Sequence, residues 1–187
     1  MQVKIKFLGG VRTVTGSSHL ITTDNAKVLF DMGLFQGRRD EFYEVNTTFS
    51  YNPRELDAVI LSHAHIDHCG NLPSLIKKGM RCKIYSTHAT RDLCKLMLED
   101  SGKIQEEDIR YVNKINKRLG LPFRKPLYTK KEAAKAAKRR FQTLFYGQRF
   151  CVAKNCFVTL LDAGHILGSS SVVLEIKEQD KNRRVDA

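Results

Sequence analysis

The sequence predicts an α/β protein in which two sheets pack face to face and helices lie on the outside. Short β-branched or alternating segments fill the first part of the chain, capped helical segments follow, and further strand segments come last. A length of 187 residues with 42% hydrophobic residues suits one domain with its own core. No apolar run reaches the roughly 18 residues that cross a bilayer, so we expect no membrane partner and a cytoplasmic location.

The predicted strands are short segments with an alternating or continuously apolar pattern. They cover residues 3–8, 18–22, 27–31, 58–62, 83–86, 149–153, 157–162 and 171–176. The pairs Asp24-Asn25 and Lys154-Asn155 are typical of hairpin turns and separate neighbouring strands.

Four helices are predicted between the strands, and each has a recognisable end. They cover residues 72–78, a segment from Thr87 or Thr90 to residue 99, residues 105–118 and residues 130–141. Asn71 can cap the first helix, and Gly120 can end the third. Thr129 and Glu132 have the spacing of a capping box for the fourth.

Positive charge is concentrated in one part of the chain. The formal net charge is +12, and residues 103–149 hold fourteen Lys and Arg against four acidic residues. We interpret this segment as a basic helical insert. Such a density favours a polyanionic partner, and a solvated helical surface is the alternative.

The segment from Leu61 to Gly70 carries four metal-capable side chains directly after an apolar strand: His63, His65, Asp67 and His68. Residues two apart in an extended backbone project to the same side, so His63 and His65 can hold one ion together. Imidazole and carboxylate groups are ligands that zinc uses in hydrolytic sites. A lone histidine is usually structural, but this cluster would leave several polar groups unsatisfied if it were buried without a metal.

The five cysteines show no CxxC pattern, which favours reduced thiols. Cys69 lies beside the histidine cluster. We expect it to be a small buried neighbour, with a ligand role as the alternative.

His-x-His-x-Asp-His is the signature of the metallo-β-lactamase superfamily, and other segments resemble the same family. Phe7-Leu8-Gly9-Gly10 with Val14-Thr15-Gly16-Ser17-Ser18 looks like its opening hairpin and loop. The segment 29–37, Leu-Phe-Asp-Met-Gly-Leu-Phe-Gln-Gly, is similar to the first motif of the β-CASP nucleases, and 162–169, Asp-Ala-Gly-His-Ile-Leu-Gly-Ser, to their third. The resemblance implies an αββα sandwich of which this chain is an incomplete, N-terminal part.

The resemblance also implies roles for individual residues. His63, His65 and His165 would hold a first Zn²⁺, and Asp67 and His68 a second. Asp67 and Asp31 would be catalytic residues, with Asp31 accepting a hydrogen bond that fixes the ligands in place. His19 and His88 match no ligand of the family, and we expect them to be structural.

The implied activity is zinc-dependent cleavage of single-stranded RNA. In the basic segment we expect nucleic-acid contacts from five side chains: Lys130, Lys131, Lys138, Arg139 and Arg140. Two alternatives remain, another hydrolase of this fold (a thioesterase or lactonase) and a non-catalytic module that binds RNA or metal. A homodimer is also left open.

The family pattern continues beyond the motifs present here. It requires a further aspartate that bridges the two ions and a β-CASP domain with two more histidines. Asp186 follows no glycine, and we do not assign it the bridging role. We therefore expect residues 1–187 to form a partial domain of low activity.

Overall fold

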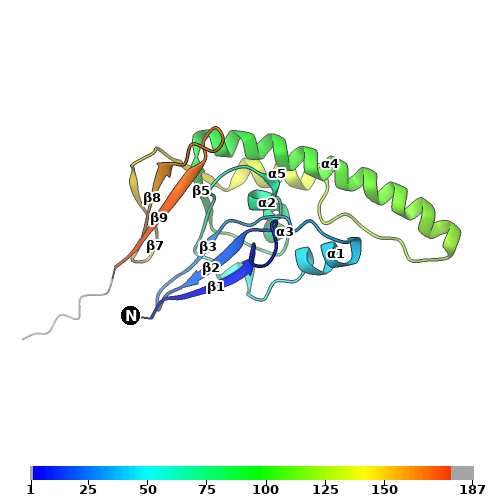
Figure 1. Ribbon diagram of the computed structural model, residues 1–187, viewed down its shortest axis with the longest axis horizontal. Helices are drawn as coiled ribbons and strands as arrows, with labels where there is room; N and C mark the ends of the chain where they lie inside the picture. Colours follow the sequence, from blue (N-terminus) through cyan, green and yellow to red (C-terminus); the bar gives the residue numbers. More distant parts are fainter. Residues whose placement is uncertain (1, 178–187) are drawn as a thin grey trace, which may run out of the picture.

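Two β-sheets and a layer of helices make up the fold in the computed structural model, which describes residues 2–177 (Figure 1). Of the side chains in this range, those of Arg39, Asp40 and Arg139 are outside the description. The first sheet has six strands in the order β1-β2-β3-β4-β5-β6. Their bounds are β1 Lys4–Gly9, β2 Ser18–Thr22, β3 Lys27–Phe30, β4 Ala58–Ile60, β5 Lys83–Thr87 and β6 Phe141–Leu144. The first two pairs are antiparallel, and the pairs from β3 to β6 are parallel.

The second sheet is an antiparallel meander of three strands: β7 Arg149–Ala153, β8 Cys156–Asp162 and β9 Ser170–Ile176. The helices are α1 Arg39–Thr47, α2 Ile66–Cys69, α3 Leu72–Lys77, α4 His88–Leu119 and α5 Lys130–Arg139, with a 3₁₀ turn at Pro53–Glu55. These helices lie on the side of the first sheet that faces away from the second (Figure 1). None of the helices in the described range is long and apolar enough to cross a membrane.

Side-chain alternation along β3 and β4 produces two separate cores. Val28 and Ile60 face the second sheet and pack with Val158 and other residues of β8. Leu29 and Val59, their neighbours along the strands, face the helices instead. All four side chains are fully buried, as expected for parallel strands covered on both faces.

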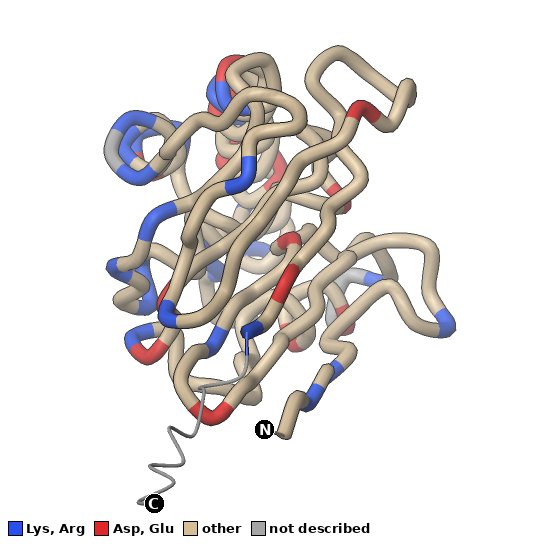
Figure 2. Tube along the Cα trace, turned by 90° about the vertical axis from the view of Figure 1, so that its left-hand side faces the viewer, with Lys and Arg blue, Asp and Glu red and all other residues tan. Residues whose placement is uncertain are grey.

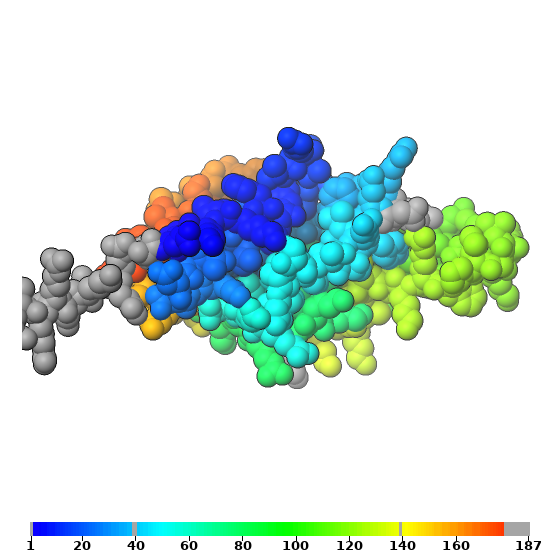
Figure 3. Space-filling model, turned by 90° about the horizontal axis from the view of Figure 1, so that it is seen from below, coloured from blue at the N-terminus to red at the C-terminus, as the bar shows by residue number. Residues whose placement is uncertain are grey.

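Helix α4 is longer than predicted, because one continuous helix replaces the two that we expected on either side of residue 102. Gly102, which falls between the two predicted helices, lies where α4 meets the start of α5. A Cβ on Gly102 would be 2.8 Å from the backbone nitrogen of Lys130, so glycine here permits close helix packing. The C-terminal part of α4 projects beyond the sheets (Figures 1 and 3).

The ends of other elements test the capping predictions. Thr87 caps α4, and Thr129 forms the predicted capping box with Glu132 at α5. Asn71 precedes α3 but does not cap it, because its amide donates to the backbone oxygen of Asn46.

Four short elements were not predicted, namely α1, the 3₁₀ turn Pro53–Glu55, α2 and β6, and one predicted helix was too long. Helix α1 was missed, and α5 ends at Arg139, two residues earlier than expected. The residues that follow form β6, which pairs with β5. The Phe-Gln-Thr-Leu sequence of β6 is too short to show a strand pattern by itself.

Candidate metal centre

The histidine cluster lies where β4 ends, at the carboxyl edge of the parallel strands. The chain leaves β4 at Ile60 and enters α2 at Ile66, so His63 and His65 occupy the connection between them. His165 comes from the turn between β8 and β9 of the second sheet. The cluster therefore takes side chains from both sheets.

Three imidazole nitrogens converge on the same small space. Nε2 of His63 is 3.1 Å from Nδ1 of His65, and Nε2 of His165 is 3.2 Å from that same nitrogen. Two ligand nitrogens of a tetrahedral zinc ion, each about 2.0–2.1 Å from the metal, are roughly 3.3–3.4 Å apart. Three lone pairs that point at one another repel unless a proton or a cation lies between them. The donor set and its spacing thus fit a zinc ion, and among the described residues this is the one group of three such donors that lies within 4.8 Å.

A hydrogen-bond relay beneath the cluster sets which nitrogen of His63 is free. The hydroxyl of Ser62 has one hydrogen, and the carboxylate of Asp31, which can only accept, lies 2.8 Å away. The Ser62 oxygen then accepts from Nδ1–H of His63 at 2.9 Å. Nε2 of His63 is left as an unprotonated lone pair facing the other histidines.

Asp31 also orients His68, in this case by a direct hydrogen bond. Its carboxylate accepts from Nδ1 of His68 at 2.7 Å and from the backbone N–H of Ser62 at 2.8 Å. Nε2 of His68 then faces Asp67, whose carboxylate oxygen is 3.6 Å away. Asp31 is 1% exposed, so its carboxylate is not accessible for direct contact with a substrate.

The protonation state of His63 suits metal binding. Burial, together with the charges of His68, His65 and His165, lowers the pKa of His63 to about 4, so this imidazole is neutral at pH 7. Burial also lowers the pKa of His68, but the hydrogen bond and charge of Asp31 and the charge of Asp67 outweigh it, and the net shift is upward.

The turn that carries His165 is fixed by several short contacts. Ser169 Oγ accepts hydrogen bonds from the backbone N–H groups of His165 and Ile166. The hydroxyls of Thr87 and Thr90, at the start of α4, both donate to the carbonyl of Gly168, at 2.7 and 2.8 Å. Sequence analysis missed the roles of Ser62, Ser169 and these threonines. Ser62 and Ser169 had only their position in the histidine motifs as a signal, and Thr87 and Thr90 had only their signal as caps of a helix.

The comparisons with known proteins agree with this geometry. A family model described as the metallo-beta-lactamase superfamily matches residues 11–135. The chain belongs to the metallo-beta-lactamase superfamily. The prediction made from the motifs is thereby confirmed at the level of the superfamily.

Two relatives indicate the branch of the superfamily. Ribonuclease TTHA0252 of Thermus thermophilus is 39% identical over 118 residues, covering 63% of this chain and 27% of the relative. The transcription termination factor FttA of Lokiarchaeum is 34% identical over 182 residues, covering 97% of this chain and 26% of the relative. The chain spans about a quarter of the length of these relatives. Among solved structures, the Rm3 metallo-beta-lactamase has the same fold, with a TM-score of 0.52 at 17% identity over 96% of this chain and 55% of that one.

The structure describes four of the five predicted nucleic-acid residues, and it places Arg140 at the opposite end of the parallel strands from the histidines. Lys130, Lys131 and Lys138 are exposed on α5, and the guanidinium of Arg140 donates to the carbonyl of Arg81. The carbonyl of Arg140 accepts from the backbone N–H of Ile84 at the start of β5, whereas the histidines follow the other end of the parallel strands. Arg139 was predicted with them, but its side chain is outside the described set. In Figure 2, many Lys and Arg positions, drawn in blue, lie along the left-hand edge of the trace.

The remaining candidates have structural roles. Cys69 is buried, and its thiol donates to the carbonyl of Ala64, so it fills space behind the site as expected. The His19 ring lies between Phe7 and Phe30.

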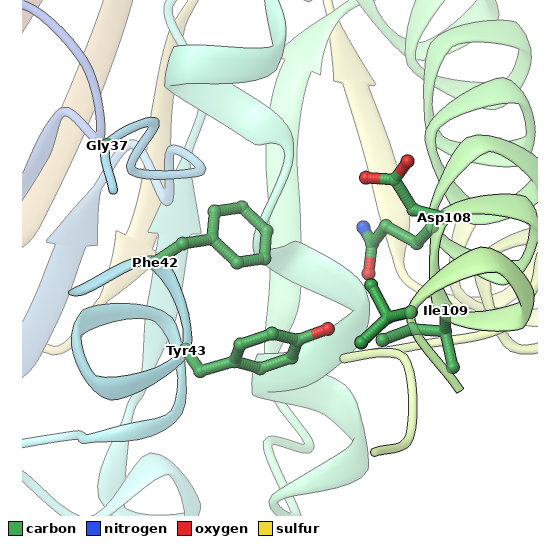
Figure 4. A pocket seen from close by; sticks show the side chains of 7 residues that line it. Gly37, Phe42, Tyr43, Asp108 and Ile109 are labelled. Carbon is green, nitrogen blue, oxygen red and sulfur yellow. The ribbon is translucent and has the colours of Figure 1, made fainter. Parts of the chain in front are cut away.

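A cavity of about 370 Å³ lies between α1 and α4, where Phe42, Tyr43 and Asp108 point into it (Figure 4). None of the metal or nucleic-acid residues predicted from the sequence lines this cavity.

Proposed function

We propose that this chain is the metal-holding part of a zinc-dependent phosphodiesterase that cleaves single-stranded RNA. The observation that carries the proposal is the convergence of His63, His65 and His165, with Asp67 and His68 beside them. The relatives named as a ribonuclease and as transcription termination factors favour RNA as the substrate.

His63, His65 and His165 would hold the first zinc ion, with its remaining position open for water or substrate. Asp67 and His68 would hold a second, which needs further ligands. When bound, zinc lowers the pKa of a water molecule and stabilises negative charge on phosphoryl oxygens.

This chain's own residues supply orientation. Asp31 and Ser62 keep Nε2 of His63 unprotonated and directed at the site, and Asp31 does the same for His68. The Asp67 backbone is held by its neighbours, since its carbonyl accepts from the N–H of Ser17 at 2.8 Å. A Cβ on Gly33 would lie 1.7 Å from the same carbonyl oxygen, so only glycine lets the loop after β3 pass so close.

The exposed lysines of α5 would bind RNA phosphates without reading bases.

The test compares the purified chain with the His63→Ala/His65→Ala double variant. We expect bound zinc, measured by elemental analysis, and cleavage of end-labelled RNA to be lost together. A Cys151→Ala variant, which changes an exposed metal-capable side chain outside the cluster, is the control. Unchanged zinc in the double variant would contradict the ligand assignment.

The same assay separates the alternatives. Hydrolysis of a thioester or lactone without cleavage of RNA would overturn the choice of substrate. Zinc and RNA binding without any hydrolysis would support a non-catalytic module.

A further inference from the structure

An exposed aromatic pair lies next to the turn that carries His165. Phe145 follows the last residue of β6 and is 70% exposed. Its ring faces that of His88, with 4.8 Å between the centroids and 36° between the planes. Nε2 of His88 is 3.0 Å from the hydroxyl of Thr143, so the histidine is held by a hydrogen bond as well as by the ring contact.

The turn that presents Phe145 is well ordered by its own hydrogen bonds. The backbone N–H of Phe145 donates to the side-chain oxygen of Gln148, and the N–H of Gln148 donates back to the carbonyl of Phe145. Gly147, at φ +71°, donates its N–H to the carbonyl of Leu160 in the second sheet. The ring is therefore presented to solvent on a rigid support.

The chain neighbours of both rings hold the turn between β8 and β9. Thr87, beside His88, donates to the carbonyl of Gly168 at 2.7 Å, and Tyr146, beside Phe145, donates to the carbonyl of Ser169 at 2.8 Å. The start of α4 and the turn before β9 lie side by side in Figure 1. The aromatic pair and His165 thus belong to one connected unit of structure.

An exposed apolar ring that is held rigidly near the histidine cluster indicates a binding surface. Unpaired bases stack on such rings whatever their sequence, and single-stranded RNA is commonly bound in this way. We propose that Phe145, supported by His88, stacks on an unpaired base of the RNA and so positions the neighbouring phosphate at the histidine cluster. This inference rests on the proposed function and assigns to the same site a preference for unpaired RNA.

The absence of tryptophan from the sequence provides a direct test. A Phe145→Trp variant carries a single tryptophan, and we expect single-stranded oligouridine RNA to quench its fluorescence in a saturable manner. An abasic ribose-phosphate oligomer of equal length should not quench it. Phe123→Trp is the matched control, since Phe123 is 67% exposed and follows α4 far from the histidines along the chain; we expect no quenching there.

Affinity measurements separate stacking from general apolar contact. Phe145→Ala and Phe145→Leu should both weaken oligouridine binding by about tenfold, whereas Phe145→Tyr should retain it. Zinc content and affinity for the abasic oligomer should not change in any of these variants. Equal affinity of Phe145→Leu and the wild type would contradict stacking.

The outcomes distinguish this inference from the proposed function. Loss of RNA cleavage with quenching intact would reject catalysis and leave the stacking site in place. RNA binding detected by anisotropy without quenching of Phe145→Trp would overturn the stacking site alone. Absence of RNA binding would overturn both. A wild-type dimer that Phe145→Ala converts to monomer would show that the ring is a protein interface.

Discussion

Replacing Asp31 with asparagine would remove a buried negative charge beneath the metal site while nearly preserving the size of the side chain. Asp31 accepts hydrogen bonds from the backbone and hydroxyl of Ser62 and from Nδ1 of His68. An amide NH₂ in this position would face at least one of these donors without an acceptor. The tautomers of both His63 and His68 would then no longer be fixed.

The expected loss of zinc affinity can be estimated from the effect of removing a residue that hydrogen-bonds to a metal ligand. Loss of such a partner typically weakens metal affinity by about 10- to 100-fold, or roughly 1.4–2.7 kcal/mol. Asparagine is the appropriate substitute because Asp31 has φ +57°. Asparagine tolerates this left-handed backbone, whereas alanine would add strain that obscures the effect on zinc.

The assay is a competition for zinc between the protein and a chromogenic chelator at neutral pH. Asp57→Asn is the control, because Asp57 also accepts from a backbone N–H, that of Lys27, but at the far end of β3. Thermal unfolding would verify that both variants fold. A zinc dissociation constant within twofold of the wild type for folded Asp31→Asn would refute the relay.

Other predictions concern packing and RNA. Gly102→Ala should lower the free energy of unfolding, since overpacking costs about 1–3 kcal/mol and helix propensity returns about 1 kcal/mol; a chemical denaturation midpoint that rises would contradict this. Thr129→Ala should cost about 1 kcal/mol through loss of the α5 cap, and an unchanged midpoint would show that the cap is not needed. Replacing Lys130, Lys131 and Lys138 with Gln should weaken RNA binding and reduce its logarithmic salt dependence by about 0.7 per lost phosphate contact. Equal slopes in anisotropy titrations would remove α5 from the RNA site.

Local patterns in the sequence predict the part of the candidate site that is formed by residues close together in the chain. His63 and His65 share one connection after a buried strand, so two-residue spacing alone brings them together. His165 is 100 residues away from His65, and no spacing rule connects them. Its assignment required the family motif, and the structure then placed the two nitrogens 3.2 Å apart.

Features that depend on tertiary contacts could not be predicted in the same way. Gly102 in isolation favours a helix end, and only the approach of α5 explains why the helix continues. Strand β6 is defined by its pairing with β5 and not by its own composition. The hydroxyl of Ser62 has a role only because Asp31 and His63 lie on either side of it.

The position of the metal centre also connects its chemistry to the stability of the fold. The two sheets are joined beside the site by a hydrogen bond from the backbone N–H of Ser170 to the carbonyl of Ser62 at 2.8 Å. A zinc ion held by His63 and His65 from one sheet and His165 from the other would cross the same boundary. Because unfolding separates these ligands, binding would favour the folded state, by about 2.7 kcal/mol when free zinc is 100 times the dissociation constant. The same contacts that orient the ligands would then also hold the two sheets together.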